Sequence, residues 1–154
     1  MHRSHHGLAL LLAVLLCTVT ACETSTTRKQ LVRGYIDDLL VAERWERWDR
    51  YMAERPSYNG STLGRETFKA VASFLHTTFS DVKISVDEQK SDGAWVTTRV
   101  TVTGVQTGNF LNVPPRNRPV HFRAILLDRI EDGRVAEMWH QLDYWDALLQ
   151  VATP

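Results

Sequence analysis

The stretch EMWHQLDYW, residues 137–145, contains two acids, one histidine and three large aromatic side chains in nine consecutive positions. Asp143 is the first candidate for chemistry, because a carboxyl group among aromatic rings holds its proton more readily and can then transfer it near neutral pH. The alternative is structural. Asp143 also precedes the helix-like segment YWDALLQ, where a carboxylate would cap the helix by accepting backbone N–H bonds.

The alternation of a strand separates the candidates in this stretch. Trp139, Gln141 and Asp143 would point to one face, and His140 would point to the other. Each face carries a large aromatic and a polar group, so alternation alone does not identify the interior face. If Asp143 faces a pocket, His140 does not, unless a bulge intervenes.

The N-terminal residues predict a location. MHRSHH is a short basic opening, GLALLLAVLLCTVTA is apolar but too short for a confident membrane span, and VTAC follows. This order resembles a bacterial lipoprotein signal, in which Cys22 is diacylated after residues 1–21 are removed. A plain secretory peptide cut near Ala21 and an uncleaved anchor are the alternatives. Residues 22–29 are then the acylated cysteine and a flexible tether.

An acylated N-terminus carries more than one lipid chain, which stable membrane attachment requires. We therefore expect an outward-facing lipoprotein at the cell membrane or envelope. The only cysteines are Cys17 and Cys22, so cleavage and acylation would leave no free thiol for a disulfide, a metal or a nucleophile.

The composition argues against several classes of protein. Lysine plus arginine and aspartate plus glutamate are balanced at 18 each, without a basic stripe, which argues against a nucleic-acid partner. The histidines of the mature domain are scattered, which argues against a metal site. No glycine-rich phosphate loop follows a strand, and no Gly-x-Ser-x-Gly motif occurs, which argues against a phosphate-loop site and against a serine nucleophile on such a motif.

The elements that must position the candidates follow from the periodicity. Residues 28–52 have helical spacing and predict one bent helix or two helices, and a further helix is predicted to begin near Gly64. Residues 82–104 and 118–145 alternate and contain the turn signals DG and EDGR, which predict two long hairpins. Three helices before four antiparallel strands predict an α+β domain over residues 30–152, with helices on one face of a curved sheet.

Three segments resemble a known family, the SnoaL-like polyketide cyclases of the nuclear transport factor 2-like superfamily. They are VTGVQTGNFLNVPPRNRPVHFRA, then DRIEDGRVAEMWHQLDYW, and more weakly VRGYIDDLLVAERWERWDRYMAE. The resemblance implies a cone in which N-terminal helices close the open side of a strongly curved antiparallel sheet. It also implies cofactor-free intramolecular aldol ring closure of a polyketide ester, with the acid of the W-x-x-x-D ending, here Asp143, as general acid/base.

The resemblance suggests further site residues. Asn59, in SYNGS, lies where the family often has a pocket-mouth histidine or asparagine; the alternative is a turn residue in a left-handed conformation. Tyr35 would either point a hydroxyl into the pocket from the first helix or belong to the core. Both would assist at the substrate oxygen. The side chains predicted to bind substrate are Trp139, Gln141, His140, Trp48, Gln106, Phe110 and Arg123.

The loop between the hairpins departs from the family pattern. Gln106 stands where the family usually carries histidine, and Arg116-Asn117 follow the two prolines where Thr-Gly is usual. These changes alter the rim of the expected pocket and so the expected substrate.

Two hypotheses follow. The first is a lipid-anchored cyclase, isomerase or related hydrolase acting on a small carbonyl-containing or polyketide-like substrate. The second is a non-catalytic lipoprotein whose cone binds a small apolar ligand or a partner protein. A homodimer is compatible with either, because members of the superfamily often pair through the exposed sheet face.

Overall fold

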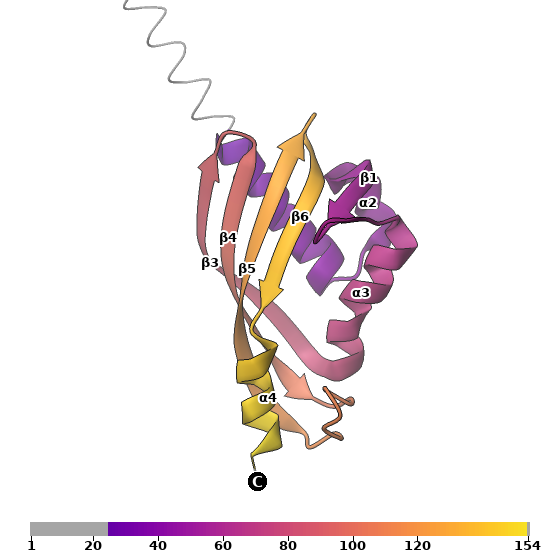
Figure 1. Cartoon of the computed structure of the whole chain (residues 1–154), viewed down its shortest axis with the longest axis vertical. Helices are drawn as coiled ribbons and strands as arrows, with labels where there is room; N and C mark the ends of the chain where they lie inside the picture. Colours follow the sequence, from indigo (N-terminus) through magenta and orange to yellow (C-terminus); the bar gives the residue numbers. More distant parts are fainter. Residues whose placement is uncertain (1–24, 154) are drawn as a thin grey trace, which may run out of the picture.

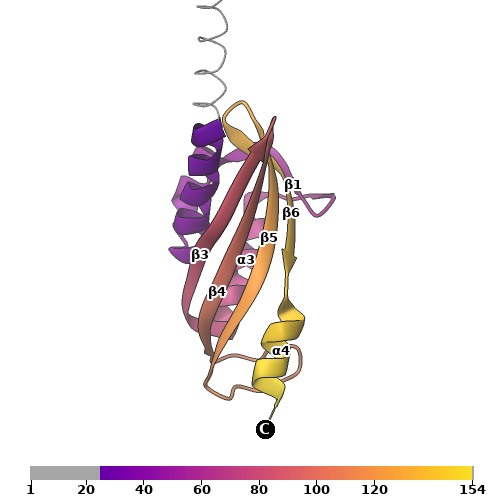
Figure 2. The ribbon, with the colours of Figure 1, turned by 90° about the vertical axis from the view of Figure 1, so that its left-hand side faces the viewer.

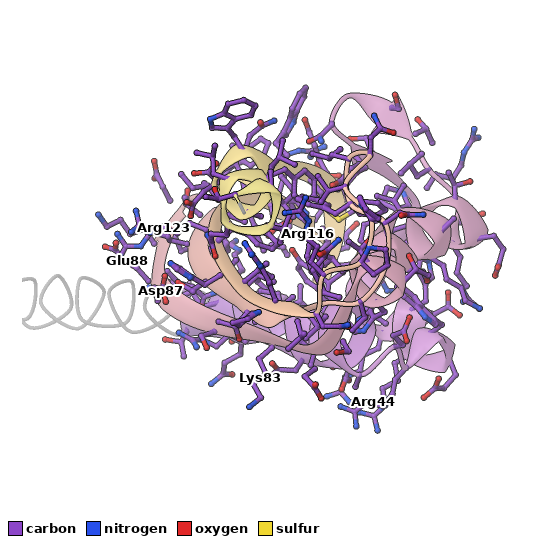
Figure 3. All side chains as sticks on the ribbon, turned by 90° about the horizontal axis from the view of Figure 1, so that it is seen from below. Arg44, Lys83, Asp87, Glu88, Arg116 and Arg123 are labelled. Atoms are coloured by element: carbon purple, nitrogen blue, oxygen red, sulfur yellow. The ribbon has the colours of Figure 1, made fainter. Side chains whose placement is uncertain are left out.

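One curved sheet is the centre of the fold. The structure, a computed structural model, describes residues 25–153, and within that range six strands pair in the order β2-β1-β6-β5-β4-β3. The strands are β1 (Met52–Tyr58), β2 (Ser61–Thr62), β3 (Phe79–Asp92), β4 (Trp95–Gln106), β5 (Arg118–Glu131) and β6 (Arg134–Leu142). Figure 1 shows the four long strands side by side, and the view from below shows the sheet curling around the interior (Figure 3).

The two predicted hairpins are confirmed. β3 and β4 pair antiparallel across a turn at Gly93, whose φ of 53° suits a two-residue turn with glycine first. β5 and β6 pair antiparallel across Asp132 and Gly133, which both have positive φ, as a type I′ turn requires. Most inward positions on these strands are apolar, with Thr98, Gln106, Asp128 and His140 as buried polar exceptions, and outward positions are rich in Thr and Arg.

Helices cover the inner face of the sheet. An α-helix over residues 25–35 continues into a π-helical turn, η1 (Ile36–Val41), and is followed by a 3-10 turn, η2 (Trp45–Arg47), and α2 (Trp48–Tyr51). The helix α3 (Arg65–Thr78) confirms the prediction near Gly64, and α4 (Tyr144–Ala152) continues from the end of β6. Figure 2 shows the N-terminal helix against the sheet and α4 following β6.

The N-terminal helix begins earlier than the sequence predicts. Residues 25–29, expected to belong to a flexible tether, are helical. Arg28 donates to the carbonyl oxygen of Gly93, and the side chain of Gln89 donates to the carbonyl oxygen of Lys29 at 3.3 Å. The tether prediction is wrong for these residues, because contacts with the β3–β4 hairpin extend the helix. The predicted signal peptide and Cys22 lie outside the described residues.

The strands β1 and β2 are absent from the sequence prediction. β1 pairs in parallel with β6, and its pairing is irregular between Met52 and Ser57. Pro56 lies in that irregular part, where no ladder N–H is needed. A short strand with a proline and two charged residues carries no clear alternation, so only the pairing with β6 reveals it.

A buried carboxylate holds the end of the π-helical turn. Asp38 accepts hydrogen bonds from Arg47 at 2.9 Å, from Tyr51 at 2.5 Å and from Arg44. Burial alone would raise the pKa of Asp38, but the hydrogen bonds from Tyr51 and Arg47 and the charge of Arg44 keep it below its usual value. This cluster fixes α2 against the helix that carries Tyr35.

No helix within residues 25–153 combines the length and the apolar composition needed to cross a membrane.

Candidate functional site

An apolar cavity lies between α3 and the inner face of the sheet. Its volume is about 60 Å³. The lining side chains are Leu40, Tyr58, Phe68, Val71, Ala72, Leu75, Ile84, Val102, Ala124, Leu126, His140, Leu142 and Tyr144. A wider hollow shares five of these residues and adds Asn59, Phe74 and Gln141, so it forms the mouth. The hollow has a volume of about 400 Å³, so a small, mostly apolar ligand would occupy the hollow and the cavity together.

Three buried polar side chains meet beside the cavity. Tyr35 donates its hydroxyl to Oδ2 of Asp128 at 2.9 Å, and Nε2 of His140 lies 3.0 Å from Oδ1 of the same carboxylate. Tyr35 and Asp128 are fully buried and His140 is 6% exposed. Nε2 also lies 3.3 Å from the Tyr35 hydroxyl. Each carboxylate oxygen of Asp128 therefore has a hydrogen-bond partner.

The register of β5 and β6 brings the acid and the histidine together. Asp128 pairs with Met138 and Leu126 pairs with His140, so Asp128 and His140 are diagonal neighbours on the inner face. Tyr35 reaches them from the end of the helix over residues 25–35. A register shift between Arg129 and Ile130 lies between this part of the hairpin and its turn.

The hydrogen bonds assign the proton on the histidine ring. An ionised carboxylate only accepts hydrogen bonds, so Asp128 requires the Nε2 atom of a neutral His140 to carry the hydrogen. Nδ1 is then an unprotonated acceptor. Within the described residues Nδ1 has no hydrogen-bond partner and is not sealed from solvent, and His140 lines the cavity. The free lone pair of His140 is therefore available to a ligand.

Tyr35 supports this assignment. Burial is the largest cause that raises its pKa well above the usual value, and the charge of Asp128 and the hydrogen bond to it raise the pKa further. The phenol therefore stays protonated and donates to the carboxylate. Tyr35 lies in the core and does not line the cavity, so the core alternative describes its position, and its predicted assistance at the substrate oxygen has no support from the geometry.

Asn59 positions the histidine from the mouth of the cavity. Its side chain accepts from the backbone N–H of His140 at 2.9 Å and donates to the His140 carbonyl oxygen at 3.3 Å. The side-chain amide of Asn59 thus makes the pair of backbone hydrogen bonds that a neighbouring strand residue would make with β6. Its φ of 47° is left-handed, so both the pocket-mouth and the turn interpretations apply.

Asp143 lies outside the cavity. It is exposed, forms the N-cap of α4, and accepts a hydrogen bond from the backbone N–H of Asp146 at 3.0 Å. The expectation that this carboxylate faces a pocket is wrong, because His140 and Met138 take the inner face of β6. The catalytic role predicted for Asp143 depended on that position and has no support from the geometry.

The outer face of the sheet holds three of the predicted substrate-binding residues. Trp139 is 43% exposed and donates its indole N–H to Glu137. Gln141 is exposed and reaches only the mouth. Arg123 is exposed on β5 and lies on the outside of the curled sheet (Figure 3). The predictions for Trp139 and Arg123 are corrected, since strand alternation turns them away from the cavity.

Two other predicted residues are structural. Gln106 is fully buried and donates to the carbonyl oxygens of Gly108, Val113 and Pro114 at 2.9, 3.2 and 3.0 Å, so it fixes the loop after β4. Phe110 is a buried core residue. Neither lines the cavity.

Trp48 forms part of the second layer of the cavity wall. It is 3% exposed and packs on Phe68, a cavity residue, with a ring separation of 5.3 Å. The tryptophan therefore supports the wall without reaching a ligand, which corrects its predicted binding role.

Sequence reasoning missed Asp128. The sequence did carry a signal, because every second residue before Asp128 on β5 is apolar and inward. These residues are Phe122, Ala124 and Leu126. An acid at an inward position of an apolar strand requires a buried partner. That partner is 12 residues away and belongs to the next strand.

The comparisons with known proteins agree with this fold. A family model described as SnoaL-like polyketide cyclase matches residues 30–151. The chain is 28% identical over 98 residues to the aklanonic acid methyl ester cyclase DnrD of Streptomyces peucetius, covering 63% of this chain and 68% of that protein.

Two solved structures from Streptomyces resemble the fold. TsrD from Streptomyces laurentii has a TM-score of 0.72 and 21% identity, covering 82% of this chain and 95% of its own. IdmH from Streptomyces antibioticus has a TM-score of 0.73 and 22% identity, covering 82% of this chain and 99% of its own. These likenesses show the cone-shaped arrangement of helices on a curved sheet.

Proposed function

Because the chain belongs to the SnoaL-like polyketide cyclase family, we propose that it is a cyclase or isomerase that acts on a small carbonyl-containing substrate with His140 as general acid/base. The observation that carries this proposal is the His140–Asp128 pair beside an apolar cavity. Asp128 orients the ring and presents Nδ1 to the substrate. The enzyme needs only its own side chains for this chemistry.

The first step is removal of a proton from the carbon next to a carbonyl group. The C–H bond breaks, its electron pair forms a carbon–carbon double bond, and the carbonyl π pair moves onto oxygen as an enolate. Nδ1 of His140 takes the proton, and Asp128 stabilises the resulting imidazolium. Tyr35 holds the second oxygen of Asp128, so the carboxylate cannot rotate away.

The second step returns the proton. In an aldol closure the enolate carbon bonds to a second carbonyl carbon, and the alkoxide receives the proton from His140. In an isomerisation the proton returns to another carbon of the enolate. Both routes balance without an added reactant, and the apolar walls limit the water that would compete for the enolate.

Deuterium exchange tests this proposal. The purified protein is incubated in D₂O with a β-keto ester such as ethyl 2-methylacetoacetate, and loss of the α-proton is followed by NMR. We expect exchange faster than buffer, and His140→Gln reduces the catalysed rate by about 10² or more. The exposed residue His121 provides the control His121→Gln, which keeps the wild-type rate.

Two results would contradict the proposal: wild-type exchange no faster than buffer, or an unchanged rate in His140→Gln. A protein that binds the ester without exchanging its proton would instead be a ligand-binding member of the family.

We further propose, on the sequence of residues 1–22, that Cys22 is diacylated and attaches the domain to the outward face of a membrane. The expressed chain should incorporate labelled palmitate, and Cys22→Ser should abolish the incorporation. Equal labelling of both proteins would contradict the proposal.

A further inference from the structure

Two tyrosines share the cavity with His140. Tyr58 ends β1 and Tyr144 begins α4, and both line the cavity as well as the hollow at its mouth. They belong to elements that are far apart in the chain.

Their hydroxyl groups differ from those of the other tyrosines. The chain has four tyrosines. Tyr35 and Tyr51 each donate to a buried carboxylate, on Asp128 and Asp38 respectively. Among residues 25–153, the hydroxyls of Tyr58 and Tyr144 have no hydrogen-bond partner, yet neither oxygen is sealed from solvent. The walls of the cavity and of the hollow therefore include two phenol hydroxyls that are free to donate.

Packing fixes the ring of Tyr58. It meets the edge of His140 at a ring separation of 5.3 Å and that of Phe68 at 5.8 Å, both at steep angles. Such edge-to-face contacts restrict rotation of the ring. The hydroxyl of Tyr58 is thus held near the imidazole that would take the substrate proton.

Aromatic neighbours also fix Tyr144. Phe74, Phe110 and Phe122 lie 6.0, 5.7 and 5.8 Å from its ring. Burial, and then the proximity of Tyr58, raise the pKa of Tyr144 to about 12. Burial, and then the charge of Asp128, raise the pKa of Tyr58. Both phenols therefore remain protonated donors at neutral pH.

We propose that the hydroxyls of Tyr58 and Tyr144 donate hydrogen bonds to one carbonyl oxygen of the substrate and hold the enolate oxygen while His140 takes the α-proton. This rests on the proposed function and adds the groups that polarise the carbonyl. Donors aimed at the developing negative charge lower the barrier most where water is excluded.

The proposal also narrows the substrate class. Two donors beside one base suit a ketone or β-keto ester with an enolisable carbon next to the bound carbonyl group. The lining between them is aliphatic and aromatic, so the rest of the bound substrate is apolar.

A bound ketone tests the donor pair without turnover. Acetophenone has one carbonyl acceptor and a flat apolar ring, and donated hydrogen bonds lower the frequency of its carbonyl stretch. We expect infrared difference spectra of the wild-type protein with ¹³C-carbonyl acetophenone to show a stretch below its value in hexane. Tyr58→Phe and Tyr144→Phe should each shift it back toward that value and weaken binding about fivefold.

A third variant is a matched control. Tyr51→Phe removes a hydroxyl that lies on Asp38 and not in the cavity, so it should leave the bound stretch unchanged. Far-ultraviolet circular dichroism shows whether each variant is folded, and the phenylalanine ring preserves the packing.

Three results would overturn the proposal: a bound stretch at the hexane value, no bound carbonyl band at the solubility limit of acetophenone, or a shifted stretch that both cavity variants retain. Failure of the proposed function is a separate result, because it appears as wild-type α-proton exchange no faster than buffer.

Discussion

Replacing Asp128 by asparagine is the sharpest test of the proton assignment on His140. The carboxylate accepts from Tyr35 at 2.9 Å and from Nε2 of His140 at 3.0 Å. Asparagine keeps one acceptor oxygen and replaces the other with an NH₂ donor. If the oxygen stays on Tyr35, the NH₂ group faces Nε2, and the imidazole must move its hydrogen to Nδ1 to accept it.

The expected magnitude follows from that switch. A hydrogen on Nδ1 occupies the lone pair that faces the substrate, so general-base catalysis is lost, which is typically worth about 10²–10⁴ in rate. The shape of the side chain and at least one hydrogen bond remain, so Asp128→Asn should lose only about 1–2 kcal/mol of unfolding free energy. Asp128→Ala removes the shared acceptor of two buried donors that lie 3.3 Å apart, so at least one of them is left unpaired at about 1–3 kcal/mol each, and the variant should lose about 1–6 kcal/mol.

Two measurements check this reasoning. Deuterium exchange gives the rate, and ¹⁵N–¹H correlation spectra of the imidazole rings identify the protonated nitrogen, with His140→Gln assigning the signal. We expect hydrogen on Nε2 in the wild-type protein and on Nδ1 in Asp128→Asn. Hydrogen on Nδ1 in the neutral wild-type ring, or a wild-type exchange rate in Asp128→Asn, would refute the assignment.

The remaining predictions concern stability. Asn59→Gly retains the left-handed backbone but loses the side-chain bonds to β6, so urea unfolding should show a loss of about 1–2 kcal/mol, whereas Asn112→Gly, at another exposed residue of positive φ, should be near neutral. Gln106→Leu leaves several part-buried backbone groups of the loop after β4 without partners and should lose about 1–3 kcal/mol in the same assay. Tyr144 keeps its proton in the folded protein to about pH 12, whereas the unfolded chain releases it near pH 10. The stability it contributes is therefore complete below pH 10 and lost between pH 10 and 12, and Tyr144→Phe should show a smaller fall of the denaturation midpoint over that interval.

Clear outcomes contradict each of these expectations. Equal losses in Asn59→Gly and Asn112→Gly would mean that the side chain of Asn59 does not hold β6. A neutral Gln106→Leu would show that the loop finds other partners. Identical alkaline unfolding in Tyr144→Phe and the wild-type protein would contradict the buried environment of that phenol.

Hydrophobic periodicity along the sequence was sufficient to predict most of the fold. Alternation with the turn signals at Gly93 and Gly133 located both hairpins, and helical spacing located α3. β1 escaped prediction because its pairing with β6 depends on residues about 80 positions away, and its own side chains do not alternate.

The site was only partly predictable, because the sequence alone does not say which face of β6 is interior. The two faces of residues 138–144 each carry a polar and an aromatic group. The decisive information is the pairing of β6 with β5, whose inward positions are apolar except for Asp128. The inward carboxylate of Asp128 shows that the face of β6 with His140 is the interior one. Asp143 lies outside that face and caps α4.

The parallel pairing of β1 with β6 and the contacts of Tyr35 join distant parts of the chain, which has a consequence for biosynthesis. The bond between Tyr35 and Asp128 spans 93 residues, and the contact between Tyr35 and His140 spans 105. A ribosome must complete almost the whole domain before these groups can meet, and long-range contacts of this kind slow folding. An incomplete chain that ends before β6 therefore has neither the imidazole of His140 nor the strand beside which β1 folds, and the proposed proton transfer would require the last stage of synthesis.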